Sequence, residues 1–294
     1  MSGATKKLVV CGGSGFLGSR ICKAAVSRGW DVTSISRSGQ PQWQNVTASS
    51  SPPAWAHRVS WERADIFRPA QYAALLTGAD FVVHSMGILL EADYKGVLSG
   101  RESPISGLQK AFSASKGRPL SSSSNPLHQE QQQQQQSETQ LTYEMMNRDS
   151  AILLAKEAAR EKVRAFGYVS AAGGAPVLPA RYITTKREAE DVIAGEFGGP
   201  GGMRGVFFRP PFMYDSSRAL TMPLAGLSAA GAMVNGLTGG ILGGFLGTAV
   251  VKPLKADLVA DAVVEALDDE SVRGPVEVAQ LEELGNKSWR KTMV

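Results

Sequence analysis

The chain has 294 residues, the size of one large α/β domain or of two small ones. Its net charge is +4, with 43% hydrophobic and 20% charged residues, so a core can form and wholesale disorder is excluded. Its basic residues form no long block, its three histidines are scattered and its two cysteines provide no disulfide framework. We therefore expect neither nucleic acid nor a metal ion as a ligand.

Along the chain, short continuous apolar runs, which predict strands, alternate with stretches whose apolar residues recur at helical spacing. We expect strands at residues 7–11, 31–36, 58–64, 80–85, 165–170 and 205–209. We expect helices at residues 16–28, 69–78, 141–162, 182–195 and 257–267, followed by a frayed tail beyond Gly285. The first strand starts at Lys7, so we expect no cleavable presequence. Repeated strand–helix units predict a single α/β domain over residues 1–294, a Rossmann-like doubly wound parallel sheet.

Three segments interrupt this alternation. Residues 40–56 are rich in Ser and Pro, which is typical of a loop. Residues 99–140 are rich in Ser and then in Gln, which predicts a disordered surface insertion. Residues 219–251 carry no charged side chain but many glycines. We expect a Gly-rich apolar cap over residues 215–255 that faces a substrate or a membrane surface, in preference to a membrane span.

A glycine-rich turn, GGSGFLG at residues 12–18, lies between the first predicted strand and the first predicted helix. Gly12 and Gly15 would allow the backbone to approach a diphosphate, and Gly18 would allow close packing of helix and strand. The helix N-terminus would supply N–H donors. An ordinary glycine-rich turn is the alternative. We expect a dinucleotide to contact Gly12, Ser14, Gly15, Phe16, Leu17 and Gly18.

The ends of the next strands indicate which dinucleotide is bound. An acidic residue after the second strand would favour NAD, whereas this chain has Arg37 between two serines. A guanidinium favours a 2′-phosphate, so we expect NADP(H) in preference to NAD(H), with a solvated surface arginine as the alternative. Asp65 and Ile66, after the third strand, would flank the adenine. The middle of the cofactor would face Ser85, Met86 and Gly87.

A tyrosine and a lysine follow the fifth strand at helical spacing. The i, i+4 relation places Tyr182 and Lys186 on one helix face. A nearby cation stabilises a phenolate, so Tyr182 would exchange a proton near neutral pH while Lys186 holds the nicotinamide ribose. Ser170 would hydrogen-bond a substrate carbonyl. Asn147 would support an ordered water near Lys186, or else serve as a capping or core amide.

The sixth strand ends at the motif RPPF, residues 209–212. Ligands of open α/β sheets bind at the carboxyl ends of the strands, so Pro210 and Phe212 would line the nicotinamide pocket. His84 is expected to be a core histidine without catalytic work.

Together these motifs resemble an atypical, extended-like member of the short-chain dehydrogenase/reductase superfamily. GGSGFLG, VVHSMG, YITTK and FFRPPFMYD occur in the expected order across residues 7–267. Four further motifs resemble those of the fungal members of the superfamily that act in mitochondrial coenzyme Q (ubiquinone) biosynthesis: ISRSG, VVHSMGILLE, YEMMN and YITTKREAE. That branch is similar in turn to the 39 kDa accessory subunit of complex I, which binds NADPH without an established catalytic cycle.

The resemblance implies a location and partners. It implies a mitochondrial protein on the matrix side of the inner membrane, in contact with coenzyme Q biosynthetic complex proteins and with the membrane surface. Cys11, Asp215 and the short spacing from Ser170 to Tyr182 depart from the family pattern and argue against a sugar-nucleotide substrate. One hypothesis is an NADP-linked oxidoreductase on a hydrophobic quinone precursor. The others are a non-catalytic NADPH-binding scaffold and, less favoured, a redox-sensing regulator.

Overall fold

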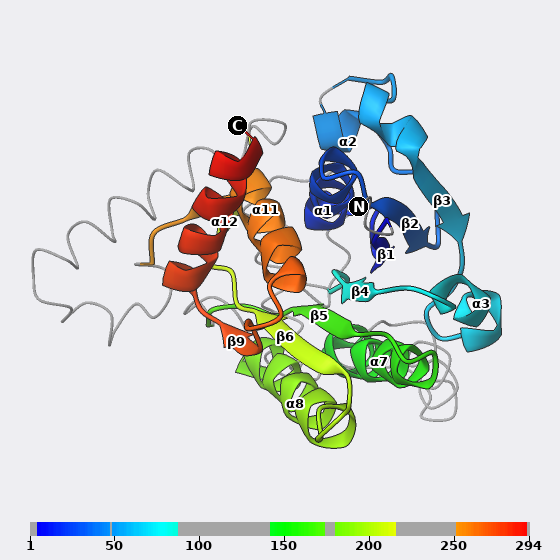
Figure 1. Ribbon diagram of the computed structural model, residues 1–294, viewed down its shortest axis with the longest axis vertical. Helices are drawn as coiled ribbons and strands as arrows, with labels where there is room; N and C mark the ends of the chain where they lie inside the picture. Colours follow the sequence, from blue (N-terminus) through cyan, green and yellow to red (C-terminus); the bar gives the residue numbers. More distant parts are fainter. Residues whose placement is uncertain (1–4, 48, 88–141, 174–179, 216–250, 293–294) are drawn as a thin grey trace, which may run out of the picture.

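The main sheet of the protein is parallel throughout. The computed structural model describes residues 5–47, 49–87, 142–173, 180–215 and 251–292. Within these ranges seven strands pair in the order β3-β2-β1-β4-β5-β6-β9 (Figure 1). Strand order reverses between β1 and β4, which is where open α/β sheets bind ligands. The bounds are Lys7–Cys11 for β1, Asp31–Ser36 for β2, Val59–Arg63 for β3, Phe81–His84 for β4, Ala165–Val169 for β5, Arg204–Phe208 for β6 and Gly274–Val276 for β9.

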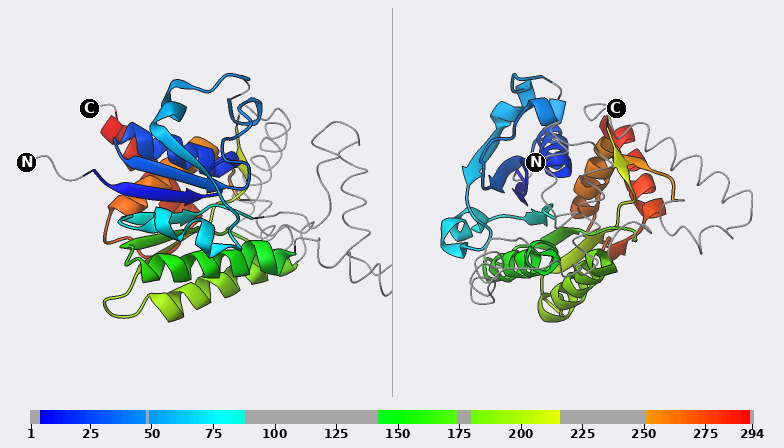
Figure 2. Two further views of the ribbon diagram at one scale, coloured as in Figure 1. Left: turned by 90° about the vertical axis from the view of Figure 1, so that its right-hand side faces the viewer. Right: turned by 180° about the vertical axis from the view of Figure 1, so that it is seen from behind.

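Helices cover both faces of this sheet (Figures 1 and 2). One face is covered by α1 (Phe16–Ser27), α11 (Ala256–Asp268) and α12 (Val278–Thr292). The other face is covered by α3 (Ala73–Leu76), α7 (Ser150–Arg160) and α8 (Ala180–Phe197). Side chains alternate along each strand, so Val10 packs into the first core and Val9 into the second. The arrangement confirms the predicted Rossmann-like fold.

Shorter elements connect the main ones. They are α2 (Gln44–Thr47), the 3₁₀ helices η1 (Ala54–Arg58) and η2 (Pro69–Gln71), the π-helix η3 (Glu144–Asp149) and the paired strands β7 (Met213–Tyr214) and β8 (Leu254–Lys255). The expected insertion at residues 99–140 and residues 216–250 of the expected cap lie outside the described residues.

The prediction of a loop at residues 40–56 is wrong in part. Both α2 and the start of η1 form within it, because tryptophans pack together there. The ring of Trp43 lies edge-on to Trp55 and to Trp61, with centroids 5.8 and 5.6 Å apart. This small core stabilises a segment that its Ser/Pro-rich composition did not predict to be ordered.

The prediction of a frayed tail beyond Gly285 is also wrong, since α12 continues to Thr292. Leu281 and Leu284 are buried in the core on the side of α11. Near the end of the helix, Lys291 Nζ lies 2.6 Å from Glu265 Oε1. Burial of leucines early in the helix and ion pairing near its end therefore hold the segment in place.

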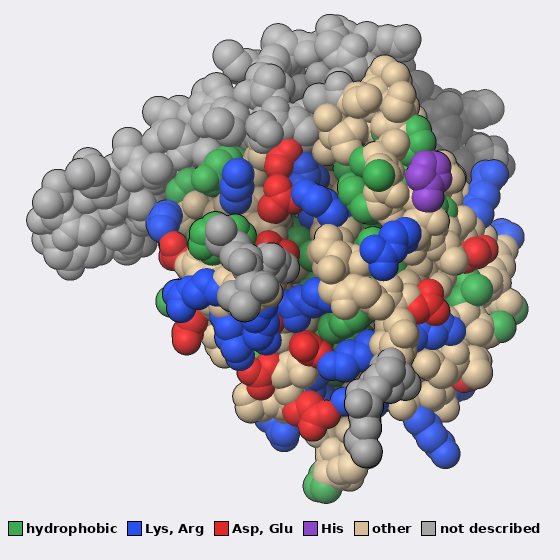
Figure 3. Space-filling view, turned by 45° about the horizontal axis from the view of Figure 1, so that its top comes forward, with side chains coloured by type: hydrophobic (Ala, Val, Ile, Leu, Met, Phe, Trp, Pro, Cys, Tyr) green, Lys and Arg blue, Asp and Glu red, His purple; other side chains and the backbone are tan. Residues whose placement is uncertain are grey.

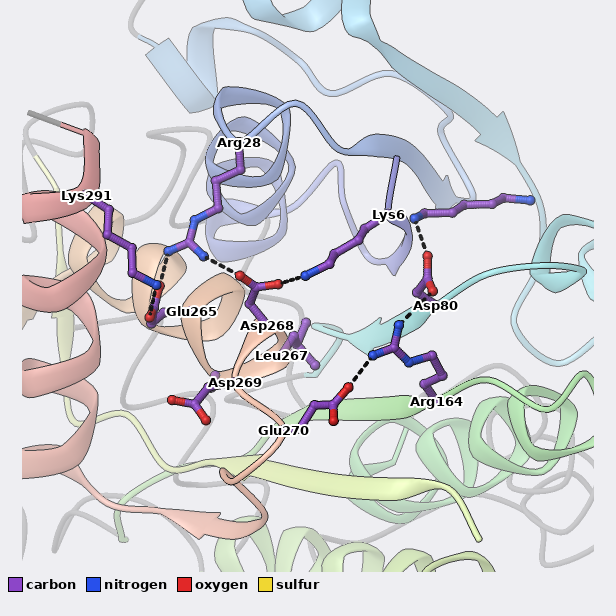
Figure 4. A network of polar contacts seen from close by, with 12 residues as sticks. Lys6, Arg28, Asp80, Arg164, Glu265, Leu267, Asp268, Asp269, Glu270 and Lys291 are labelled. Atoms are coloured by element: carbon purple, nitrogen blue, oxygen red, sulfur yellow. Dashed lines mark hydrogen bonds and ion pairs between the residues drawn. The ribbon is translucent and has the colours of Figure 1, made fainter. Parts of the chain in front are cut away.

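Ion pairs join elements at the amino ends of the strands, away from the predicted site. Lys6 pairs with Asp268, and Arg28 lies 2.5 Å from Glu265 and 3.7 Å from Asp268 (Figure 4). A second set in Figure 4 consists of Arg164 with Asp80 and Glu270. On the face shown in Figure 3, basic and acidic side chains are interspersed.

Candidate dinucleotide site

The glycine turn between β1 and α1 forms a cradle with no room for added side chains. Gly12 has a φ of +88°, and its N–H donates to the carbonyl of Ile35 at 2.8 Å. A Cβ on Gly18 would lie 2.2 Å from Gly12 O, and one on Gly12 would lie 2.8 Å from Met86 Cγ. The helix α1 starts at Phe16, and the first N–H groups of a helix have no acceptor inside the helix. The cradle therefore fits a diphosphate.

The cradle is connected to the end of β2. The hydroxyl of Ser38 donates to Ser14 Oγ at 3.3 Å. Arg37, next to Ser38, is exposed. Arg63, at the end of β3, is also exposed, and it pairs in register with Ser36 at the end of β2. Sequence reasoning missed Arg63, because only the pairing of β3 with β2 brings it to this edge. Two arginines therefore lie at the ends of adjacent strands.

Asp65 and Ile66 follow β3, as the sequence predicts. Asp65 Oδ1 accepts a hydrogen bond from the N–H of Phe67 at 3.0 Å. Ile66 is buried, and its carbonyl accepts a hydrogen bond from the hydroxyl of Tyr72 at 3.2 Å. These bonds fix the turn at the carboxyl end of β3, and contact with adenine stays a prediction.

The segment after β4 brings distant residues together. The hydroxyl of Ser85 donates to the carbonyl of Cys11 at 2.9 Å, so Ser85 lies against the glycine cradle. A Cβ built on Gly87 would lie 3.0 Å from Asn147 Oδ1 and 3.4 Å from Lys186 Nζ. The segment after β4, the middle of η3 and the first half of α8 therefore bring three predicted site residues together. We call Gly87, Asn147 and Lys186 the ribose cluster.

Lys186 is buried, with 4% of its surface exposed. Its Nζ donates to the carbonyl of Val169 at 3.0 Å and lies 5.6 Å from the centroid of the Tyr182 ring. Burial lowers the pKa of Lys186 to about 7, although Glu190 opposes this shift. The amine therefore titrates near neutral pH.

The acidity of Tyr182 differs from the prediction. The i, i+4 spacing does place it beside Lys186, but burial and the neighbouring Tyr143 raise the pKa of Tyr182 to about 12. Arg187 opposes this rise only in part. Desolvation of the phenolate outweighs the nearby cation, so the phenol stays protonated at neutral pH.

Ser170 is buried at the end of β5 and contacts a residue that sequence reasoning missed. Nη1 of Arg187 donates to Ser170 Oγ at 2.8 Å, and Nη2 donates to the carbonyl of Ala171 at 2.7 Å. A guanidinium is only a donor, so the O–H of Ser170 remains able to donate to another oxygen.

A buried carboxylate anchors Arg187. Glu190, 2% exposed, lies 2.6 Å from Arg187 and also pairs with Arg209. Arg209 reaches Glu277, just before α12, at 2.6 Å. The i, i+3 spacing of Arg187 and Glu190 was the sequence signal available for this network.

Pro210 and Phe212 lie at the carboxyl end of β6, as predicted. The carbonyl of Pro210 accepts a hydrogen bond from the N–H of Ala172 at 2.9 Å, and that of Phe212 accepts one from Leu254 at 3.1 Å. These bonds join β6 to the ends of β5 and β8. Contact of either residue with a nicotinamide stays a prediction.

The part of the chain that the structure describes offers no metal site and no membrane span. Among its residues, no group of three or more His, Cys, Asp or Glu side chains is placed to hold a metal ion. Within the same part of the chain, no helix combines the length and hydropathy of a membrane span.

Comparisons with known proteins identify the family of this chain. Residues 8–94 match the model of the "NAD dependent epimerase/dehydratase family". MIOREX complex component 2 of Saccharomyces cerevisiae is 40% identical over 239 residues, covering 76% of this chain and 78% of that protein.

Two solved structures share the fold. A short-chain type dehydrogenase/reductase from Mycobacterium ulcerans has a TM-score of 0.56 at 17% identity, covering 97% of this chain and 91% of its own. UDP-glucuronic acid 4-epimerase from Bacillus cereus, in complex with NAD, has a TM-score of 0.53 at 16% identity, covering 92% and 78%.

Proposed function

The chain belongs to the NAD dependent epimerase/dehydratase family of short-chain dehydrogenases/reductases, and from this premise we propose that it is an NADP(H)-linked oxidoreductase acting on a hydrophobic quinone precursor in coenzyme Q biosynthesis. The observation that carries the proposal is the position of the ribose cluster beside the glycine cradle. A dinucleotide whose diphosphate lies on the cradle would extend its nicotinamide ribose toward Asn147 and Lys186.

Arg37 and Arg63 support the preference for NADP(H). They stand at the ends of β2 and β3, where the adenosine ribose lies in this fold. The residues after β2, RSGQ, include no carboxylate that would favour the 2′-hydroxyl of NAD. Charge-assisted hydrogen bonds from two guanidinium groups would favour a 2′-phosphate.

The side chains at the site fit reduction of a carbonyl better than oxidation of an alcohol. When bound, the nicotinamide would supply hydride. The raised pKa of Tyr182, about 12, keeps its proton in place, so the phenol can donate it to the carbonyl oxygen. Ser170 retains an O–H for the same oxygen, since Arg187 only donates to it.

The proposed location is the matrix side of the mitochondrial inner membrane, with coenzyme Q biosynthetic complex proteins as partners. It is supported by the motif resemblance and by likeness to a yeast protein named as a component of a complex. The uncharged residues 219–251 would contact the membrane surface. Flotation with anionic liposomes tests this contact: the double variant L242E/F245E should float less than the wild type, and equal flotation would remove the membrane from the proposal.

A second candidate is a non-catalytic NADPH-binding scaffold. The specific observation in its favour is the raised pKa of Tyr182, about 12, since a phenol that binds its proton so tightly is also a weak proton donor. The yeast relative is likewise named as a component of a complex. Both candidates require a dinucleotide on the cradle.

The test of the proposal is to identify the small molecule released from protein purified from its native source. Mass spectrometry should find NADP(H). Recovery of NAD(H) alone would refute the preference, and recovery of neither dinucleotide would refute both candidates. As a matched measurement, the double variant R37A/R63A should weaken NADPH binding more than NADH binding.

A further inference from the structure

Asn147 lies in a π-helical turn. The π-helix η3 spans Glu144–Asp149 and continues directly into α7. A π turn is wider than an α turn and usually occurs as a short insertion at a functional site. Its backbone carbonyls need donors, because burial without a partner is costly. The donors of η3 therefore indicate what holds Asn147 in place.

One donor comes from the neighbouring strand. The hydroxyl of Tyr168, a fully buried residue of β5, donates to the backbone carbonyl of Asn147. A tyrosine hydroxyl at a fully buried position usually has a hydrogen-bond partner, and here the partner is this carbonyl. The bond therefore joins β5 to the π turn at Asn147, which is itself a member of the ribose cluster.

The ring of the same tyrosine contacts the other polar member of the cluster. Lys186 Nζ lies 5.2 Å from the centroid of the Tyr168 ring, and it donates to the carbonyl of the next residue, Val169. Cations favour the face of an aromatic ring at this distance. Tyr168 therefore contacts Asn147 through its hydroxyl and Lys186 through its ring.

A second brace holds the preceding residue of the π turn. The hydroxyl of Ser150 donates to the carbonyl of Met146 at 2.9 Å, and His84 Nε2 lies 2.9 Å from the oxygen of the same hydroxyl. Because Ser150 has one proton, His84 must donate through Nε2. Burial lowers the pKa of His84 to about 3, which keeps the ring neutral. His84 thus supports η3 from β4, next to Tyr168 on β5.

We propose that Tyr168 is a positioning residue that aligns Asn147 and Lys186 to receive the nicotinamide-ribose end of the dinucleotide. The inference rests on the proposed function, since it assumes that a dinucleotide lies on the cradle. The adenosine end would bind across the ends of β2 and β3, where Tyr168 makes no contact in the proposal. The two halves of the ligand can therefore be tested separately.

The experiment compares NADPH with adenosine 2′,5′-bisphosphate, which lacks the nicotinamide ribose. In Tyr168→Phe the ring remains and the bond to Asn147 is lost. The Kd for NADPH should rise about three- to tenfold, the effect of one hydrogen bond, whereas the Kd for the bisphosphate should not change. Binding of the bisphosphate also shows that the variant is folded.

Tyr72→Phe is the matched control. It removes the same group from another fully buried tyrosine, whose hydroxyl donates to the carbonyl of Ile66 near the predicted adenine site. Any effect of this variant should fall equally on both ligands. A purely structural role for Tyr168 would give the same pattern in Tyr168→Phe and would overturn the inference.

A double-mutant cycle tests whether Tyr168 acts through Asn147. Asn147→Ala should show the same selective loss for NADPH, and the total loss in the double variant with Tyr168→Phe should be smaller than the product of the two single losses. Full additivity would overturn the inference, as would a wild type that binds both ligands equally. Failure of the wild type to bind either ligand would instead refute the proposed function.

Discussion

Arg20 and Asp215 form a buried ion pair that joins α1 to the first residue of the predicted cap. Nη2 of Arg20 lies 2.6 Å from Oδ1 of Asp215, with 5% and 8% of their side chains exposed. The same guanidinium donates to the carbonyl of Phe16 at 2.7 Å, in the first turn of α1. Asp215 departs from the glycine expected in the family pattern, and its buried partner gives that departure a structural reason.

Asp215→Ala should therefore destabilise the protein by about 3 kcal/mol, because it leaves the buried charge of Arg20 without this partner. Urea unfolding measures the effect. The control is Lys252→Ala, which breaks an exposed pair with Glu282 at 2.6 Å and should cost under about 1 kcal/mol. Equal costs in the two variants would contradict the prediction.

Gly18→Ala should prevent a dinucleotide from binding. The added Cβ would lie 2.2 Å from Gly12 O, so the cradle must open before the residue fits. The Kd for NADPH should rise about tenfold or more, with a loss of stability of about 1–3 kcal/mol. Isothermal titration and urea unfolding report the two effects.

The same substitution at Gly195 is the control. Gly195 lies within α8, where an added Cβ would meet no atom within 4 Å. Gly195→Ala should leave NADPH binding unchanged and stabilise the protein by up to about 1 kcal/mol, because alanine has the higher helix propensity. Normal NADPH binding by Gly18→Ala would show that the cradle does not hold the diphosphate.

Local patterns predicted the elements that carry their own signal. The glycine turn and the first two strands have the bounds expected from short stretches of sequence. β9 was missed because Gly274–Val276 is three residues long and includes a proline, so only its parallel pairing with β6 makes it a strand. The tryptophan core was missed because its three rings come from separate elements, and only the tertiary structure brings them into contact.

The positions of the candidate site residues at the ends of the strands and on α8 were predictable from the sequence, but the contacts between them were not. The spacing of Tyr182 and Lys186 sufficed to place both on one face of α8. Neither the role of Tyr168 nor the effect of burial on acidity could be read in the same way. Desolvation depends on what every neighbouring element packs against the side chain, and the sequence alone does not supply that information.

Burial of Lys186 should make stability depend on pH. Its pKa is about 7 in the folded chain against an ordinary value of 10.5, so between these limits the unfolded chain binds a proton that the folded chain lacks. Stability therefore rises with pH through this window, by at most about 1.4 kcal/mol per pH unit.

Urea unfolding of the wild type and of Lys186→Met at pH 7 and pH 9 measures this contribution. The difference in unfolding free energy between the two proteins should change in favour of the wild type at pH 9. A parallel pH dependence in the wild type and Lys186→Met would mean that Lys186 keeps an ordinary pKa.

Tyr182→Phe separates the oxidoreductase from the scaffold. The variant keeps the ring that lies 5.6 Å from Lys186 Nζ but cannot donate a proton. For an oxidoreductase, NADPH binding should stay within about twofold, and NADPH oxidation by a prenylated benzoquinone should fall about a hundredfold or more. For a scaffold, neither the bound dinucleotide nor the coenzyme Q content of cells carrying the variant should change.

Tyr214→Phe is the control for this test. Tyr214 is half-buried in β7, and its substitution should leave both readouts unchanged. Normal coenzyme Q content together with normal NADPH binding in Tyr182→Phe would therefore decide for the scaffold.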